Sequence, residues 1–187
     1  DASVTTLPNG LEVIIREDHA HPLVSVQVWI KAGSLQEEQH TGAGIAHCVE
    51  HMLFKGTAKR DAAQISQGIQ ALGGYVNAYT SFNRTVYWID GLAEYMDGYL
   101  DVLGDMVRHS KFDAEELLRE MDVIRREMDM CQDDPGRRSS RRLFEVAYVR
   151  SPYRFTVIGY PDIFNELKRE DIFNYYAEQY AANNVFF

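Results

Sequence analysis

The chain has 187 residues, of which 45% are hydrophobic and 25% charged, a composition that predicts one folded domain and excludes an intrinsically disordered chain. Its 19 basic and 28 acidic residues give a net charge of −9, which argues against nonspecific binding to nucleic acid or to an anionic membrane. No apolar run approaches the roughly 20 residues that span a bilayer, and two cysteines are too few for a disulfide scaffold. A bacterial cytoplasm and a periplasm are both compatible with this composition.

In the first ninety residues, strand signals alternate with helix signals. Apolar runs on both sides of Pro8-Asn9-Gly10 predict a hairpin, and Thr41 is the expected cap of the first helix. A second helix is expected to begin at Asp61 and to end before Gly73. The expected elements are, in order, strands 4–7, 11–16 and 23–31, helices 42–54 and 61–72, and strands 75–81 and 85–90.

The second half of the chain follows the 3.6-residue period of helices. One apolar stripe runs from Leu92 to Val107, and Asp113 with Glu116 predicts a capping box for the next helix. The expected elements are helices 92–107, 113–132, 138–149 and 163–180 and a short strand over 184–187. Strands followed by helices, in two rounds, predict an α+β fold with a mainly antiparallel sheet and helices layered on one face. Because a strand has barely begun at the end of the sequence, we expect residues 1–187 to be a single domain within a longer chain.

The segment from Gly44 to Phe54 carries the pattern His-x-x-Glu-His. On a helix, His47 and His51 lie one turn apart and Glu50 lies on the same side, whereas the apolar residues fall opposite. Two imidazoles at this spacing can bind one metal ion, and a neighbouring carboxylate can accept a proton from the attacking water. The order is the inverse of the commoner zincin motif. The alternative interpretation is a chance cluster of polar side chains on a helix surface.

A third ligand is expected from the helix that follows Asp113. Glu120 and Glu127 lie seven residues apart and therefore share one face of that helix, beside an apolar stripe. Carboxylates at the border of a buried stripe favour a nearby cation. Solvated glutamates on a long helix are the simpler alternative.

These residues resemble the pitrilysin or insulinase family of zinc peptidases, which includes the mitochondrial processing peptidase. Residues 42–57 contain the pattern Gly-x-x-His-x-x-Glu-His-Met-x-Phe-Lys-Gly-Thr, and the resemblance extends over essentially the whole chain. It also rests on Pro8-Asn-Gly-Leu11, Asn77-Ala-Tyr-Thr80, Glu120 and Arg126-Glu127-Met128.

The resemblance implies a function and a set of site residues. His47, His51 and Glu127 would bind Zn²⁺, Glu50 would be the catalytic general base, and Glu120 would orient the site from outside it. The predicted activity is a zinc metalloendopeptidase. A substrate peptide would add as a strand to the edge formed by residues 75–81, which places Asn77, Ala78 and Tyr79 at the substrate.

The resemblance also implies a partner. A homologous second domain or subunit would close a chamber over the peptide substrate, so these residues would be the first domain only. A noncatalytic subunit of the same fold is the alternative function, although a complete ligand set with Glu50 weighs against it.

One further feature of the sequence stands apart from the motif. Arg137, Arg138, Arg141 and Arg142 form a basic cluster in an otherwise acidic chain. A solvated helix face is the favoured interpretation, and an acidic partner is the alternative.

Overall fold

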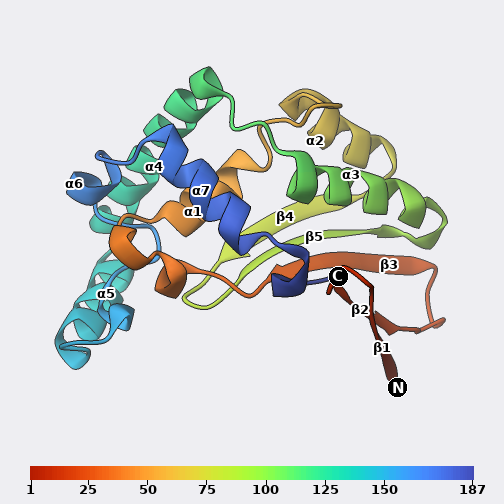
Figure 1. The fold of residues 1–187 in the computed structure, drawn as a ribbon, viewed down its shortest axis with the longest axis horizontal. Helices are drawn as coiled ribbons and strands as arrows, with labels where there is room; N and C mark the ends of the chain where they lie inside the picture. Colours follow the sequence, from red (N-terminus) through yellow and green to blue (C-terminus); the bar gives the residue numbers. More distant parts are fainter.

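A six-stranded sheet with helices on one face organises the molecule (Figure 1). The computed structural model describes residues 1–187. The strands are β1 (Ala2–Thr6), β2 (Glu12–Arg16), β3 (Leu23–Ile30), β4 (Tyr75–Thr80), β5 (Thr85–Leu92) and β6 (Val185–Phe186). Their order across the sheet is β1-β2-β6-β3-β5-β4. All neighbours are antiparallel except β2 and β6, which are parallel, so the expected α+β class and mainly antiparallel sheet are confirmed.

The helices follow the expected order, with shifted boundaries. They are α1 (Ile45–Met52), α2 (Ala62–Ala71), α3 (Met96–His109), α4 (Ala114–Asp133), α5 (Pro135–Ala147), α6 (Pro161–Phe164) and α7 (Arg169–Gln179). Asp61 caps α2 by accepting from the Gln64 N–H, and Asp113 caps α4. The capping box expected from Asp113 and Glu116 is not formed, because the Glu116 side chain accepts from Arg119 instead.

Two expected helix boundaries are wrong for identifiable reasons. Leu92 ends strand β5, and a 3₁₀ turn over Ala93–Tyr95 separates it from α3. The apolar stripe is therefore buried only from Tyr99 onward. The helix expected over 163–180 is two helices, α6 and α7.

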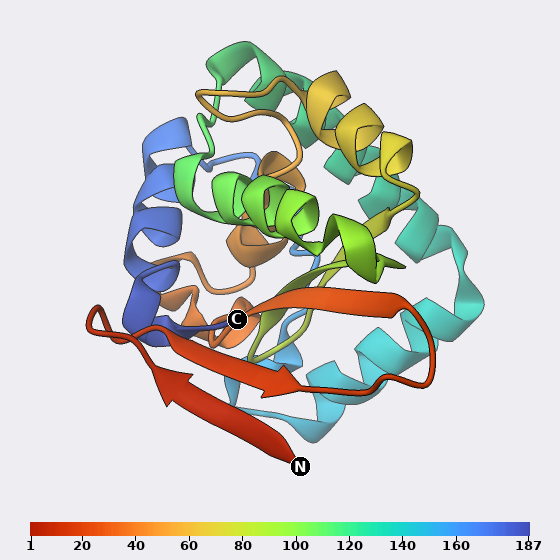
Figure 2. The ribbon, with the colours of Figure 1, turned by 90° about the vertical axis from the view of Figure 1, so that its right-hand side faces the viewer.

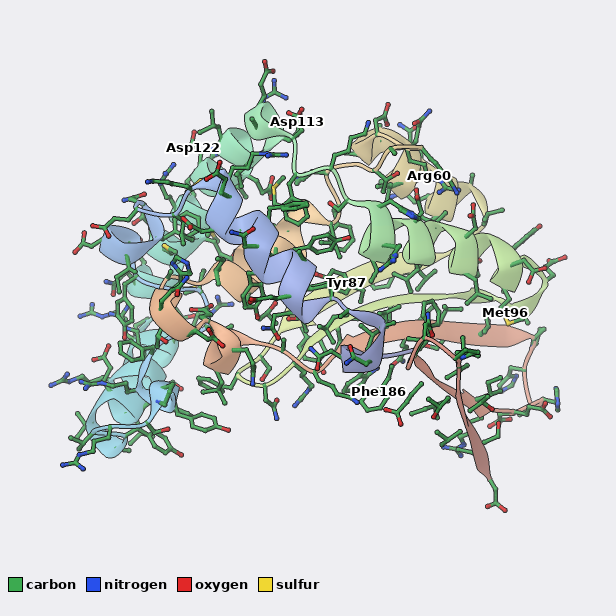
Figure 3. The ribbon with its side chains drawn as sticks, viewed as in Figure 1. Arg60, Tyr87, Met96, Asp113, Asp122 and Phe186 are labelled. Carbon is green, nitrogen blue, oxygen red and sulfur yellow. The ribbon has the colours of Figure 1, made fainter.

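The core lies between the sheet and the helices. Alternate side chains of β3 are buried, and Val28 and Ile30 are fully inaccessible, as the two-residue period of a strand requires. Tyr87 of β5 lies between the sheet and α7, where its hydroxyl is 2.8 Å from that of Tyr180 (Figure 3). Helix α1 packs within this layer against α4 and α7. Burial on several sides therefore fixes the helix that carries the His-x-x-Glu-His motif.

The opposite face of the sheet carries no helix (Figure 1). Trp29 and Tyr75 remain 37% and 60% exposed there. The β1–β2 hairpin extends away from the helices, with the N-terminus at its end (Figure 2). None of the helices is both long enough and apolar enough to cross a membrane.

Candidate metal centre

Three side chains from two distant parts of the chain converge beside α1. His47 and His51 project from α1, and Glu127 projects from α4. Their potential ligand atoms all lie within 4.8 Å of one another. The structure thus brings together the three residues that the sequence predicts as metal ligands.

The distances within this trio match the geometry of a tetrahedral metal site. The two histidine Nε2 atoms are 3.2 Å apart, and Glu127 Oε2 lies 3.7 Å from His47 Nε2 and 3.6 Å from His51 Nε2. Ligands about 2.0 to 2.1 Å from a tetrahedral ion stand about 3.4 Å from one another. Two imidazoles and one carboxylate are also a donor set that zinc binds while leaving a fourth position open. The residues present therefore fit zinc.

The protonation state of His47 suits a metal ligand. Burial, and then the neighbouring His51, lower the pKa of His47 to about 3. A neutral imidazole keeps a lone pair for a metal, whereas an imidazolium has none. His47 Nδ1 is buried and has no hydrogen-bond partner, so Nε2 is the ring nitrogen that faces other polar groups.

Glu120 lies on α4 two turns before Glu127 and orients His51. Its Oε1 lies 2.8 Å from His51 Nδ1, and its Oε2 accepts from Lys55 Nζ at 2.6 Å. Burial acts to raise the pKa of Glu120, but the hydrogen bonds from His51 and Lys55 outweigh it and lower the pKa. Glu120 is therefore a buried carboxylate that is ionised and bonded on both oxygens.

Glu50 lies on the same side of α1, next to the end of strand β4. Its Oε2 accepts from the Thr80 hydroxyl at 2.5 Å. Burial raises the pKa of Glu50, whereas the bond from Thr80 and the charge of His51 lower it, and Glu127 raises it. A carboxyl with a raised pKa is a stronger base once it is ionised, which suits it to accept a proton near neutral pH.

The start of α1 is held by a residue that the sequence analysis did not single out. Thr41 was expected to cap this helix, but its hydroxyl donates to the Glu38 carbonyl. Instead, the buried carboxyl group of Glu37 accepts the backbone N–H groups of Gly42, Gly44 and Ala46, each at 3.2 Å. The N–H groups of Gly44 and Ala46 are among those that a helix start leaves without partners.

The residues expected to contact a substrate lie on the free edge of the sheet. Asn77, Ala78 and Tyr79 belong to β4, which pairs with β5 on one side only. The Asn77 side chain accepts from the Ala78 N–H and donates to the Tyr75 hydroxyl, each at 2.8 Å. The bond between Thr80 and Glu50 joins this edge directly to α1.

Comparison with known proteins identifies the family. The model of the family described as Insulinase (Peptidase family M16) matches residues 12–159. The chain belongs to the insulinase family. It is 37% identical over 185 residues to a protein of Arabidopsis thaliana named probable mitochondrial-processing peptidase subunit beta, and the match covers 99% of this chain and 35% of that protein.

Two further similarities agree with this family. The chain is 32% identical over 180 residues to an uncharacterized zinc protease, YmxG, of Bacillus subtilis, a match covering 96% of this chain and 44% of that protein. A crystal structure of a protease from Helicobacter pylori superposes with a TM-score of 0.94 at 29% identity, covering 100% of this chain and 45% of that one. The chain thus spans less than half the length of these insulinase-family relatives.

Sequence reasoning missed three residues that hold the site of this insulinase-family domain: Glu37, Lys55 and Thr80. Lys55 and Thr80 stand within the quoted family motifs, so their place in the motifs was the available signal. Glu37 lies outside those motifs. An acidic residue shortly before a glycine-bracketed helix start was the only local hint of its role.

Proposed function

We propose that this chain is the catalytic, zinc-binding domain of an endopeptidase that hydrolyses peptides or unfolded segments. The observation that carries the proposal is the meeting of His47, His51 and Glu127 within 4.8 Å, with Glu50 on the same helix. Membership of a metallopeptidase family and the zinc protease name of the Bacillus subtilis relative support it.

The residues divide the chemistry between them. His47, His51 and Glu127 would hold Zn²⁺, which when bound supplies the Lewis acidity that activates water and polarises a carbonyl. Glu50 takes the proton of the attacking water and returns it to the leaving amine. Thr80 directs one oxygen of Glu50, and Glu120 holds His51 in place through Nδ1.

Strand β4 provides the binding edge for the substrate in this proposal. A peptide that pairs with a free sheet edge gains backbone hydrogen bonds whatever its side chains are, which suits an enzyme for unfolded segments. Asn77, Ala78 and Tyr79 would then contact the peptide. The Thr80–Glu50 contact would bring the scissile bond close to the general base.

A second domain completes the proposed enzyme. Residues 1–187 would be one domain in the N-terminal part of a longer protein, and a homologous domain or subunit would close a chamber over the peptide. The lengths of the relatives support this arrangement, because the chain covers 35% and 44% of the two reported above. The sheet face without helices, with Trp29 exposed on it, offers apolar surface for such a partner.

A noncatalytic subunit of the same fold is the competing function. It requires neither a metal nor a base, so it would not depend on how these side chains are arranged. The bond of Thr80 to Glu50 and the bond of Glu120 to His51 hold the proposed base and one proposed ligand in place, and they favour the enzyme.

The test separates metal binding from chemistry in the complete protein. Glu50→Gln is expected to keep zinc at wild-type stoichiometry and to lower hydrolysis of an unstructured peptide at least about 1,000-fold. His51→Ala is expected to lose both zinc and hydrolysis. Glu94→Gln, at an exposed glutamate outside the site, is the control and is expected to change neither. Wild-type turnover by Glu50→Gln protein would remove Glu50 from the mechanism, and zinc-free wild-type protein would defeat the proposal.

A further inference from the structure

A cavity of about 500 Å³ adjoins the metal trio. His47, Glu127 and Thr80 form one side of it, and helix α5 with residues 154–159 forms the other. A substrate held at the trio would therefore place a neighbouring group in this cavity.

The far wall of the cavity is cationic, although the chain as a whole carries a net charge of −9. Between residues 137 and 154 there is a single acidic residue, Glu145. The basic residues there are Arg137, Arg138, Arg141, Arg142, Arg150 and Arg154. Three of them, Arg137, Arg141 and Arg154, line the cavity. Arg137 and Arg141 do so together because they lie one turn apart on α5.

Two of these three guanidinium groups have no carboxylate partner. Arg141 lies 3.6 Å from Glu145 and also donates to Gln132. Arg137 donates to the thiol of Cys131 at 3.0 Å, and Arg154 donates to the Val149 carbonyl at 3.0 Å. Neither a thiol nor a carbonyl forms an ion pair with a guanidinium, although the charges of Asp134 and Glu127 act on Arg137 from a distance. Both guanidinium groups can therefore still bind an anion.

Aromatic rings complete the wall around these charges. Phe82, Phe144 and Phe155 line the cavity, and the rings of Phe82 and Phe144 stack with centroids 5.4 Å apart. Arg154 is half-buried beside the Phe155 ring, where a lower local dielectric strengthens attraction to an anion, whereas Arg137 is exposed to solvent. The cavity therefore combines room for a side chain with a cationic far wall, whereas its acidic lining residues, Glu127 and Asp129, come from α4 on the metal side.

We infer that this cavity binds a carboxylate of the peptide substrate through Arg137 and Arg154, so that the enzyme selects acidic peptides. The inference rests on the proposed function and adds a substrate class to it. A side chain of Asp or Glu supplies the carboxylate, and the C-terminus of a short peptide would supply the same chemical group.

The test measures binding in the complete Glu50→Gln protein, so that no peptide is consumed. Fluorescence anisotropy compares labelled ten-residue peptides that carry one Glu, or one Gln, at each position in turn. At the position that reaches the cavity, Glu is expected to bind at least about tenfold more tightly than Gln. The joint change Arg137→Gln and Arg154→Gln is expected to reduce this preference to less than about twofold. The preference is also expected to weaken at high salt.

Two comparisons identify the cavity and the source of the carboxylate. The joint change Arg138→Gln and Arg142→Gln also removes two positive charges, here at two positions of α5 that do not line the cavity. It is expected to leave the preference for Glu intact. Peptides with amidated and free C-termini separate side-chain from terminal carboxylates. Tighter binding of amidated Glu peptides than of amidated Gln peptides supports binding of the side-chain carboxylate.

The inference is overturned if no peptide binds, if Glu and Gln peptides bind equally, or if both arginine pairs affect the preference equally. Failure of the proposed function would be seen in other measurements, namely zinc content and hydrolysis. Wild-type protein without zinc or hydrolysis would refute the peptidase, whereas the carboxylate preference is measured by binding alone.

Discussion

Both ring nitrogens of His51 face polar partners, and this fixes the state of the ring. Nδ1 must carry the proton to donate to the Glu120 carboxylate at 2.8 Å, which leaves the lone pair of Nε2 directed at His47 and Glu127. His47 lacks such a partner, because its Nδ1 is buried without a hydrogen bond. The two histidines are thus held differently, His51 by a charged hydrogen bond and His47 by packing.

Glu120→Gln tests the hydrogen bond that holds His51. The amide keeps the shape of the side chain but removes the charge that the His51 and Lys55 protons face. Zinc affinity is expected to fall by about tenfold or more, the range found for residues that support metal ligands. Competition with a chromophoric chelator measures this change.

Glu116→Gln is the matched control for that substitution. Glu116 lies on α4 one turn before Glu120 and bonds only to Arg119. Its replacement is expected to leave zinc affinity unchanged. Equal affinities for the Glu120 and Glu116 variants would show that Glu120 does not support the site.

The sequence predicts part of this site well, and the reason is local spacing. His47, Glu50 and His51 lie within five residues, so the period of one helix determines that they share a face. Glu127 lies on another helix, and only the family resemblance distinguished it from Glu120 as the third metal ligand. The contacts of Lys55 and Thr80 depend on how α1 packs against α4 and β4, and no local pattern encodes that packing.

At the scale of an element, α1 differs from the other helices in how it begins. Helices α2 and α4 carry their own cap, Asp61 and Asp113, and both caps were predicted from the sequence. Helix α1 begins at Gly44 in the left-handed region, with φ of 75°, and takes its cap from Glu37. A glutamate reaching from a preceding turn is a tertiary contact, so the cap rules mistakenly favoured Thr41.

The Glu37 carboxyl predicts an unusual pH dependence of stability. Burial raises its pKa to about 8, although the backbone N–H groups act to lower it. The folded state then holds a proton between pH 4.5 and 8 that the unfolded state releases, so stability falls as pH rises through this window. From pH 6.5 to 8 the free energy of unfolding of metal-free protein is expected to fall by about 1.5 kcal/mol.

Urea unfolding at several pH values, with Glu37→Gln as the comparison, measures this effect. The amide does not titrate, so the variant is expected to lose the decline above pH 6.5. His47 acts with the opposite sign, because its pKa of about 3 makes stability rise with pH up to about 6.5. A flat wild-type profile between pH 6.5 and 8 would show that Glu37 is ionised throughout.

Gly44 is needed for the position of α1 as well as for its start. A Cβ at this residue would stand 2.2 Å from the Ile158 carbonyl oxygen, and its φ of 75° is unfavourable for any other residue. Gly44→Ala is expected to destabilise the protein by more than about 2 kcal/mol, since neither backbone segment can move without disturbing the other. Urea unfolding of metal-free protein provides the measurement.

Gly104→Ala supplies the contrast. Gly104 lies inside α3, and nothing stands within 4 Å of the added Cβ. This change is expected to stabilise the protein by about 0.5 to 1 kcal/mol, because alanine loses less entropy in a helix. Destabilisation of similar size in both variants would mean that contact with Ile158 is not the cause in Gly44→Ala.

For the whole molecule, the order of the strands is the feature that local patterns could not supply. The strand expected at the end of the sequence exists as β6, but its place between β2 and β3 joins the two ends of the chain. Phe186 pairs with Glu12, near the turn of the β1–β2 hairpin (Figure 3). Register between segments more than 150 residues apart depends on the packed core, whereas the hairpins of neighbouring strands were predicted from their turns.

This topology makes the β1–β2 hairpin a separate unit of stability. Every residue of β1 is exposed, and β6 is the strand that joins the hairpin to the rest of the sheet. The backbone of Phe187 donates to the Glu12 carbonyl and accepts from the Ile14 N–H, both at 2.8 Å, and Lys31 pairs with Glu12 at 3.1 Å. Few buried contacts support these bonds, so the hairpin is expected to open without global unfolding.

Phe187→Pro tests this attachment by removing one N–H from it. Loss of about 1 kcal/mol of hydrogen bonding predicts roughly fivefold faster amide exchange in residues 2–16, measured by mass spectrometry. Phe187→Ala keeps the N–H and loses only the ring, so it separates the backbone bond from side-chain packing and is expected to leave exchange in the hairpin near the wild-type rate. Zinc affinity is expected to stay constant in both variants, because β1 and β2 pack mainly against each other and against β6 rather than against α1 or α4. Exchange of the hairpin at the global rate in all three proteins would contradict a separate unit and would mean that the hairpin unfolds only with the core.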